Sequence, residues 1–419
     1  MKKRVIGLLL ALVLLMSLLP AGAMASGGEG DLPLTKLWVD GVNMLESGDD
    51  PITITLAGGG TASYDAVSNT LTLRDAIITE GHTVYGGAYG IYADGDLNIV
   101  LEGTSTAGSD KLDAGVNMDG NLTITGTGSL TTTGDDEAGI DVSGNLTVNG
   151  GTVIGNHTDD TGIDVHGDLT VNSGGTVSGT SSTQEGVHAS TLTVNGGSVA
   201  GSGLQGVCVE NSIKVESGTL TGTGTGEDSY FIYGIYVKST DGNFTVSGGS
   251  VTGKGTGEDS HGIHINGGSM TVEGGTVTSS GEGYYSSGIY IEDNGSLTVE
   301  DGEVTSTGNG ENCYGIYMDY LTITGGTVTA RANGKNGYGL NTFKDKAVTI
   351  SKQAKVIVSS ETPGNIINLL SSVTIMVDDI EYTPNNDTTE LRVENGDVTE
   401  STYKPMKQLW IDGKNMSVD

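Results

Sequence analysis

Apolar residues recur along most of the chain in short, regularly spaced blocks. A glycine followed by an aliphatic residue occurs eleven times between Gly90-Ile91 and Gly339-Leu340, at intervals of 20 to 28 residues. If this glycine is position zero, positions one and three are apolar, whereas position two is usually polar or aromatic. Such alternation is typical of a β-strand with one buried face, so each block predicts a short strand directly after its glycine.

Each block also predicts two further strands. A second apolar pair follows, as in Leu146-Thr147-Val148, and then a single aliphatic residue such as Val153 after a glycine-rich turn. A three-strand unit repeating with this period indicates a solenoid, whose stacked units align the same position of every repeat. We expect an all-β, right-handed, single-stranded parallel β-helix of about 11 to 12 rungs with N- and C-terminal caps. Its handedness follows from the general preference for right-handed crossovers.

An antiparallel sandwich is the alternative fold. Its strands recur every 8 to 12 residues or so, but it does not account for a three-strand unit that repeats as a block. The abundant glycine suits the corners of a β-helix, because such bends often need a positive φ.

The chain divides into a leader, a repeat region and two atypical ends. A basic start at residues 2–4, an apolar run at 5–19 and the small residues Ala23-Met24-Ala25 predict a cleaved secretory signal peptide. The apolar run is shorter than the roughly 20 residues of a spanning helix. We expect a signal peptide over 1–25, an N-terminal β cap over 33–83, parallel β-helix repeats over 84–360, a C-terminal cap over 361–405 and the start of a possible second module over 407–419.

The two ends share a motif. Leu37-Trp38-Val39-Asp40-Gly41 is echoed by Leu409-Trp410-Ile411-Asp412-Gly413, and the turn from Val67 to Thr70 predicts a small hairpin in the N-terminal cap. Atypical terminal units are what a solenoid requires for capping. The echo indicates a monomeric module within a longer surface protein.

The composition limits the partners. The net charge of −33 excludes recognition of nucleic acid or an anionic membrane through a basic surface. An acidic polysaccharide would be repelled unless a cation bridges it to the protein. Cys208 and Cys313 are four repeats apart, roughly 19 Å at the strand spacing, so we expect two unpaired thiols.

These motifs resemble a known group of proteins. The Leu37–Gly41 motif, Tyr64-Asp65 with Thr70-Leu71-Thr72-Leu73, and the glycine-aliphatic rungs are similar to secreted clostridial-type parallel β-helix carbohydrate-binding-domain proteins, which are pectate-lyase-like solenoids. The resemblance covers most of residues 34–360 and implies calcium-assisted polysaccharide binding, often without catalysis. It assigns no ligand residue.

Aromatic residues at position two form the candidate carbohydrate site. Four consecutive repeats carry an aromatic or imidazole ring there, and the preceding loops add more tyrosines. A tyrosine combines an apolar ring with a polar tip, which suits a sugar ring with its hydroxyl rim. The alternative is that stacked rings only support the sheet. The predicted carbohydrate-binding residues are Tyr236, His264, Tyr290, Tyr317, Tyr285 and Tyr314.

Acidic residues at position two form the candidate metal site. Asp141 and Asp164 occupy that position on adjacent repeats, with Asp136 and Asp160 in the loops before them. Stacked carboxylates repel each other unless a cation lies between them, and calcium accepts several flexible oxygen ligands. The alternative is a solvated acidic loop. The acidic loops Glu227-Asp228 and Glu258-Asp259 are secondary calcium candidates.

Catalysis has weaker support. A lyase of acidic sugars needs a base beside the uronate carboxylate, and Lys238 is the best candidate for it. A hydrolase needs a carboxylate pair across the scissile bond, and no pair stands out among so many acids. We therefore expect a secreted or cell-surface polysaccharide-binding module that is calcium-assisted and non-catalytic. The alternatives are a structural stalk or adhesin module that binds a protein and, less favoured, a polysaccharide lyase.

Overall fold

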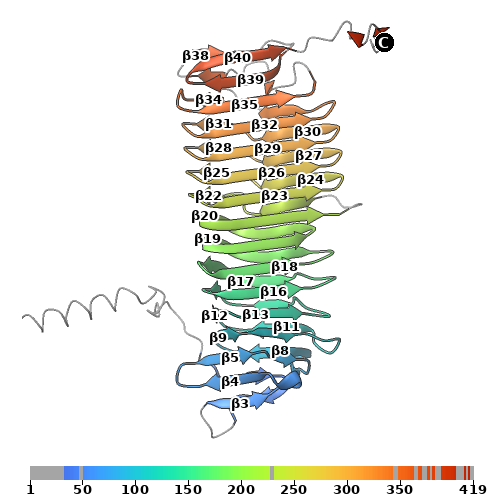
Figure 1. The fold of residues 1–419 in the computed structure, drawn as a ribbon, viewed down its shortest axis with the longest axis vertical. Helices are drawn as coiled ribbons and strands as arrows, with labels where there is room; N and C mark the ends of the chain where they lie inside the picture. Colours follow the sequence, from blue (N-terminus) through green and yellow to red (C-terminus); the bar gives the residue numbers. More distant parts are fainter. Residues whose placement is uncertain are drawn as a thin grey trace, which may run out of the picture.

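The protein is a rod built from stacked turns of β-strand (Figure 1). The computed structural model describes residues 33–46, 51–226, 231–342, 348–362, 367–369, 375–377, 380–382, 388–402, 410–411 and 414–415. The predicted signal peptide, the Glu227-Asp228 loop and most of residues 407–419 lie outside these ranges. The described strands form a β-solenoid of about 11 turns, which confirms the predicted fold class at that level. Its handedness stays a prediction.

Three parallel sheets run along the rod, and each turn adds one strand to each sheet. The first sheet begins with the strands that follow the recurring glycine. Its members are β8 (Gly87–Ala93), β11 (Ala114–Met118), β14 (Ile140–Val142), β17 (Ile163–Asn172), β19 (Glu185–Gly203), β20 (Gln205–Thr225), β21 (Ile232–Val237), β24 (Asp259–Ile265), β27 (Tyr285–Ile291), β30 (Asn312–Tyr317), β33 (Tyr338–Thr342) and β36 (Ile367–Leu369). The long strands β17, β19 and β20 continue round a corner into the next sheet.

The second and third sheets complete each turn. The second contains β5 (Thr70–Arg74), β9 (Leu97–Glu102), β12 (Leu122–Gly126), β15 (Leu146–Val148), β22 (Asn243–Val246), β25 (Ser269–Val272), β28 (Ser296–Val299), β31 (Tyr320–Ile323), β34 (Val348–Ile350) and β37 (Ile375–Val377). The third contains β6 (Ile77–Ile78), β10 (Thr104–Ala107), β13 (Ser129–Thr133), β16 (Gly151–Asn156), β18 (Gly175–Thr180), β23 (Ser250–Thr256), β26 (Thr276–Glu282), β29 (Glu303–Asn309), β32 (Thr327–Asn333) and β35 (Lys355–Ser360).

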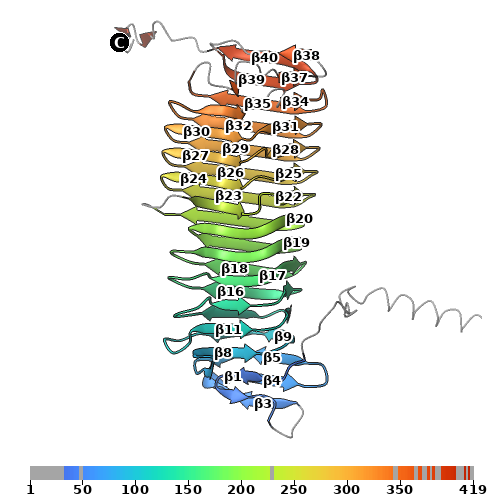
Figure 2. The ribbon, with the colours of Figure 1, turned by 180° about the vertical axis from the view of Figure 1, so that it is seen from behind.

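Antiparallel strands close both ends of the rod (Figure 2). At the N-terminal end these are β1 (Leu37–Val39), β2 (Val42–Asn43), β3 (Ile52–Thr55), β4 (Thr61–Asp65) and β7 (His82–Val84), with one 3-10 turn, η1 (Ala57–Gly59). The hairpin predicted at Val67–Thr70 is confirmed, because β4 pairs antiparallel with β5. At the other end lie β38 (Ile380–Tyr382), β39 (Thr388–Glu394) and β40 (Asp397–Thr402). The echoed motif forms an antiparallel pair, β41 (Trp410–Ile411) with β42 (Lys414–Asn415).

The core is a continuous column of aliphatic side chains. Positions one and three of the first sheet point inward, and successive rungs place like residues side by side, as with Ile140 against Ile163 and Val142 against Val165. All four are fully buried. The alternation read in the sequence therefore fixes which side chains enter the rod. No helix in the described ranges is long and apolar enough to cross a membrane.

The recurring glycine is explained by close packing, whereas the positive φ expected at the corners is found at other glycines. None of the eleven recurring glycines has a positive φ, but Gly126 and Gly151, between the second and third sheets, have φ of 104° and 78°. A Cβ on Gly186 would lie 2.3 Å from the backbone nitrogen of Ser202. The glycine is needed because the end of the third-sheet strand passes directly against it.

Candidate functional site: the outer face of the first sheet

The outer face of the first sheet presents three columns of side chains. The residue before the recurring glycine (position minus one) lies beside position two, as the ring pairs Tyr233–Tyr236 and His261–His264 show. Position four forms the third column. Position minus one carries Tyr89, Ala114, Ala138, Thr161, Glu185, Gln205, Tyr233, His261, Ser287, Tyr314 and Tyr338. Position two carries Tyr92, Asn117, Asp141, Asp164, His188, Cys208, Tyr236, His264, Tyr290, Tyr317 and Asn341. Position four carries Asp94, Asp119, Ser143, His166, Ser190, Glu210, Lys238, Asn266, Glu292 and Asp319.

An aromatic stack occupies this face from β21 to β33. The predicted column is in register, with Tyr236 beside His264, His264 beside Tyr290 and Tyr290 beside Tyr317. The rings stack along the rod: the centroids of His261 and Tyr290, and those of Tyr290 and Tyr317, are 4.3 Å apart. The stack comprises Tyr233, Tyr236, His261, His264, Tyr290, Tyr314, Tyr317 and Tyr338.

Position two is less open than the sequence predicted. His264 is only 5% exposed, because the rings of its neighbours, including Tyr233 and His261 at position minus one, pack against it, and Cys208 is fully buried. Tyr236, Tyr290, Tyr314 and Tyr317 are half-buried. Among the predicted carbohydrate residues, Tyr285 alone is exposed, at 52%, next to Tyr284 at 45%. Both faces of the Tyr290 ring contact other rings, and its hydroxyl is hydrogen-bonded with Tyr317 and Glu292, so the ring faces are closed to a ligand.

The two imidazoles in the stack are neutral near pH 7. Burial lowers the pKa of His261 to about 3. Burial, with a smaller effect from His261, holds the pKa of His264 well below its ordinary value. Nε2 of His261 is 3.5 Å from a carboxylate oxygen of Asp259, and Nδ1 of both imidazoles has no hydrogen-bond partner. His261 could not be predicted from the repeat pattern, since periodicity does not show that the residue before the glycine shares this face.

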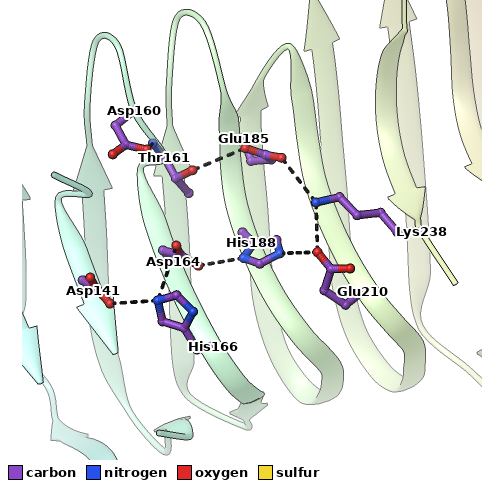
Figure 3. Close-up of polar contacts among 9 residues, drawn as sticks. All are labelled: Asp141, Asp160, Thr161, Asp164, His166, Glu185, His188, Glu210 and Lys238. Carbon is purple, nitrogen blue, oxygen red and sulfur yellow. Dashed lines mark hydrogen bonds and ion pairs between the residues drawn. The ribbon is translucent and has the colours of Figure 1, made fainter. Parts of the chain in front are cut away.

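A chain of polar contacts occupies the same face nearer the N-terminal end (Figure 3). Asp141 and Asp164 are in register on β14 and β17, as predicted. Nε2 of His166 lies 3.5 Å from Asp141 Oδ1 and 3.8 Å from Asp164 Oδ2. Nδ1 of His188 is 2.7 Å from Asp164 Oδ1. The pair of acids is therefore flanked by two histidines, His166 on the same strand as Asp164 and His188 on the next rung.

The chain continues to a lysine. Nε2 of His188 is 3.0 Å from Glu210 Oε1, and Nζ of Lys238 donates to the same oxygen at 2.9 Å. Nζ of Lys238 also lies 3.7 Å from Glu185 Oε1. Burial opposes protonation of Lys238, but the charges around it, including Glu210 and Glu185, raise its pKa above the ordinary value. A lysine held charged in this way is poorly suited to act as the base of a lyase.

The two central acids differ in their electrostatics. Burial, followed by repulsion from Asp164, raises the pKa of Asp141 to about 6. Burial would also raise the pKa of Asp164, but its hydrogen bond from His188 outweighs that effect and the pKa is lowered. Burial alone would lower the pKa of His188, but its bonds to Asp164 and Glu210 raise it. The environment therefore stabilises the negative charge of Asp164 and destabilises a negative charge on Asp141.

The remaining predicted metal residues are less closely involved. Asp136 is exposed, and Oδ1 of Asp160 accepts the backbone N–H of Thr161 at 2.6 Å. Among the described residues, no group of three or more His, Cys, Asp or Glu side chains is arranged to hold a metal ion. The structure brings Asp141 and Asp164 together, and calcium binding stays a hypothesis. Cys208 and Cys313 are both free and buried, as expected.

The fold and this face define the class of the chain as a parallel β-solenoid with one polar and aromatic outer surface. Comparisons with protein-family models, with curated proteins and with solved structures gave no match. The resemblance noted in the sequence therefore extends to the β-solenoid fold and not to a family assignment.

Proposed function

We propose that the protein is a secreted or cell-surface module that binds a linear polysaccharide along the outer face of the first sheet, without catalysing its cleavage. The observation that carries the proposal is the row of tyrosines on consecutive rungs, flanked by the exposed Tyr284 and Tyr285. The rung spacing of about 4.8 Å is comparable to the length of one sugar unit in an extended chain, so equivalent groups can meet successive units. The half-buried rings offer hydroxyls, and Tyr285 offers an open ring.

A glycan array followed by titration calorimetry tests this function. Tyr285→Ala is expected to weaken binding by about 1 kcal/mol or more, because it removes an accessible ring. Tyr320→Ala is the matched control, since Tyr320 is also exposed, at 41%, but lies at the start of the second sheet. Absence of binding across all glycans would reject the proposal.

Calcium is the second part of the proposal, with Asp141 and Asp164 as the pair that a cation would bridge. The repulsion between them supports the idea, because a bound cation would relieve it. Calcium is then expected to raise the melting temperature, since a ligand of the folded state stabilises it. A melting curve that is unchanged by calcium, or a response that survives in the Asp141→Ala, Asp164→Ala double variant, would count against this site.

A structural stalk or adhesin module is the second candidate. The specific observation in its favour is that the rings of the stack cover one another, which is what sheet support requires. A polysaccharide lyase is less favoured, because the candidate base Lys238 is paired with Glu210 and Glu185. A stalk predicts no glycan ligand, so the array distinguishes the two leading candidates.

A further inference from the structure

Two adjacent rungs at the middle of the aromatic stack gather hydrogen-bond acceptors. Strand β24 contributes Asp259, His261 and His264, and Glu292 directly follows β27. The His261 and Asp259 side chains approach to 3.5 Å, and Nε2 of His264 is 3.9 Å from Glu292 Oε1. Tyr285 is in register with Asp259, and Tyr290 with His264. These residues form one patch, the β24–β27 patch.

The two carboxylates of the patch have no cationic partner. In the described part of the chain their ion-pair contacts are with His261 and His264, which are neutral near pH 7. Among the described residues of the three columns, Lys238 is the one lysine, and it is paired with Glu210 and Glu185. Both carboxylates are nevertheless reachable, with Asp259 and Glu292 side chains 32% and 37% exposed. Partial burial of an uncompensated carboxylate is costly, and a ligand's positive charge would offset that cost.

The two imidazoles of the patch also lack hydrogen-bond partners for one nitrogen each. His261 and His264 are 7% and 5% exposed, and the Nδ1 atom of each is buried without a hydrogen-bond partner. A neutral imidazole has one acceptor nitrogen, so each histidine adds an acceptor to the patch. Ser287, in register with His261, also has a buried hydroxyl without a partner. Glu292 accepts a hydrogen bond from the Tyr290 hydroxyl, but no positive charge compensates either carboxylate.

We propose that the β24–β27 patch binds ammonium groups of amino-sugar units, with Asp259 and Glu292 each accepting N–H groups and Tyr285 contacting a sugar ring. This inference rests on the proposed function and names its substrate class as a linear glycan with free amino groups. Ammonium-to-carboxylate hydrogen bonds are the strong, charge-assisted kind, and a neutral unit cannot make them. The net charge of −33 further favours a cationic polymer.

Titration calorimetry with matched oligomers tests the proposal. The probes are an N-acetylglucosamine oligomer and the deacetylated oligomer of the same length, at a pH where the free amines are protonated. We expect the deacetylated oligomer to bind the intact protein about tenfold tighter at low salt, with the advantage shrinking as salt screens the charges. Asp259→Asn and Glu292→Gln should each remove most of this difference in affinity between the two oligomers. Glu303→Gln is the control for lost charge, because Glu303 is an exposed residue of the third-sheet strand β29.

The outcomes distinguish failure of the proposed function from failure of the amino-sugar inference alone. If neither oligomer nor any other glycan binds, the proposed function falls and this inference falls with it. If neutral glycans bind and deacetylation brings no advantage, only the inference is overturned. An oligolysine of equal charge that binds as tightly as the deacetylated oligomer would also overturn it, because the patch would then recognise charge and not a sugar. Equal losses in Glu303→Gln and Glu292→Gln would have the same consequence.

Discussion

At the scale of single residues, the environment and not the residue type decides the charge of the titratable groups on this face. His261 and His188 both lie on the first sheet, yet burial among rings lowers the pKa of one and two carboxylates raise the pKa of the other. Asp141 and Asp164 form a similar contrast on adjacent rungs. These differences make the pH dependence of stability specific to each residue.

Acidification should destabilise the rod through its buried neutral imidazole. The pKa of His261 is about 3 in the fold and about 6.5 in the unfolded chain, so the unfolded state binds more protons between these values. The contribution of neutral His261 to stability is complete above about pH 6.5. Below that pH, the free energy of unfolding falls by up to about 1.4 kcal/mol per pH unit. His261→Phe should show a shallower acid slope in urea unfolding.

The repelled carboxylate of Asp141 gives the opposite sign. Its pKa of about 6 in the fold exceeds the usual value of 3.8, so its charge costs stability once the pH rises through about 6. Asp141→Asn is expected to raise the free energy of unfolding at pH 7–8 by about 1–3 kcal/mol and to have little effect near pH 4. Asp164→Asn should instead destabilise at neutral pH, because it breaks the bond to His188. An Asp141→Asn variant that is less stable than the parent protein at pH 8 would contradict the raised pKa of Asp141.

At the scale of elements, the rungs from β21 to β33 act as one packed unit on their outer side as well as in the core. The ring of Tyr290 is held between His261 and Tyr317 from the rungs on either side of it, so the outer face contributes to rung alignment. The sequence predicted the position-two column correctly, because alternation within a strand is local. It did not predict the covering column, because the side of the residue before the glycine depends on how the corner bends.

Removing one ring from the middle of the stack should therefore destabilise the rod. Tyr290→Ala is expected to lower the free energy of unfolding by about 2–4 kcal/mol, because its contacts with His261 and Tyr317 are lost. Tyr290→Phe should cost much less, since the ring remains. Tyr285→Ala, at an exposed ring, is the control with little expected effect. Similar denaturation midpoints for the two alanine variants would show that the stack adds nothing to stability.

At the scale of the whole molecule, the caps isolate the solenoid from further strand pairing. Strand β1 pairs antiparallel with the first-sheet strand β8, and the ring of Trp38 stacks on His82 with centroids 3.4 Å apart. The carboxylate of Asp40 accepts the backbone N–H groups of Thr79 and Glu80. A covered edge prevents the end of a parallel sheet from pairing with another chain.

Deleting the N-terminal hairpin should make the rod self-associate. Removal of residues 33–45 uncovers the edge of β8, and sedimentation velocity is expected to show oligomers where the full chain shows a monomer. Trp38→Ala, which keeps the strand but loses the ring contact, should remain monomeric with a lower melting temperature. A truncated chain that stays folded and monomeric would show that β1 is not the protecting strand.

The repeat pattern was sufficient to predict the solenoid, the alignment of like positions on successive rungs and the aliphatic core, because each follows from local alternation and a repeated period. It also predicted Asp141 beside Asp164 and Tyr290 beside Tyr317, since register follows from the repeat. The exposure of the outer groups, in contrast, became known from the fold. The contact of His166 with two acids, the cover over His264 and the close approach that demands Gly186 arise where separate strands and corners meet. Those encounters depend on the three-dimensional path of the chain, which periodicity does not specify.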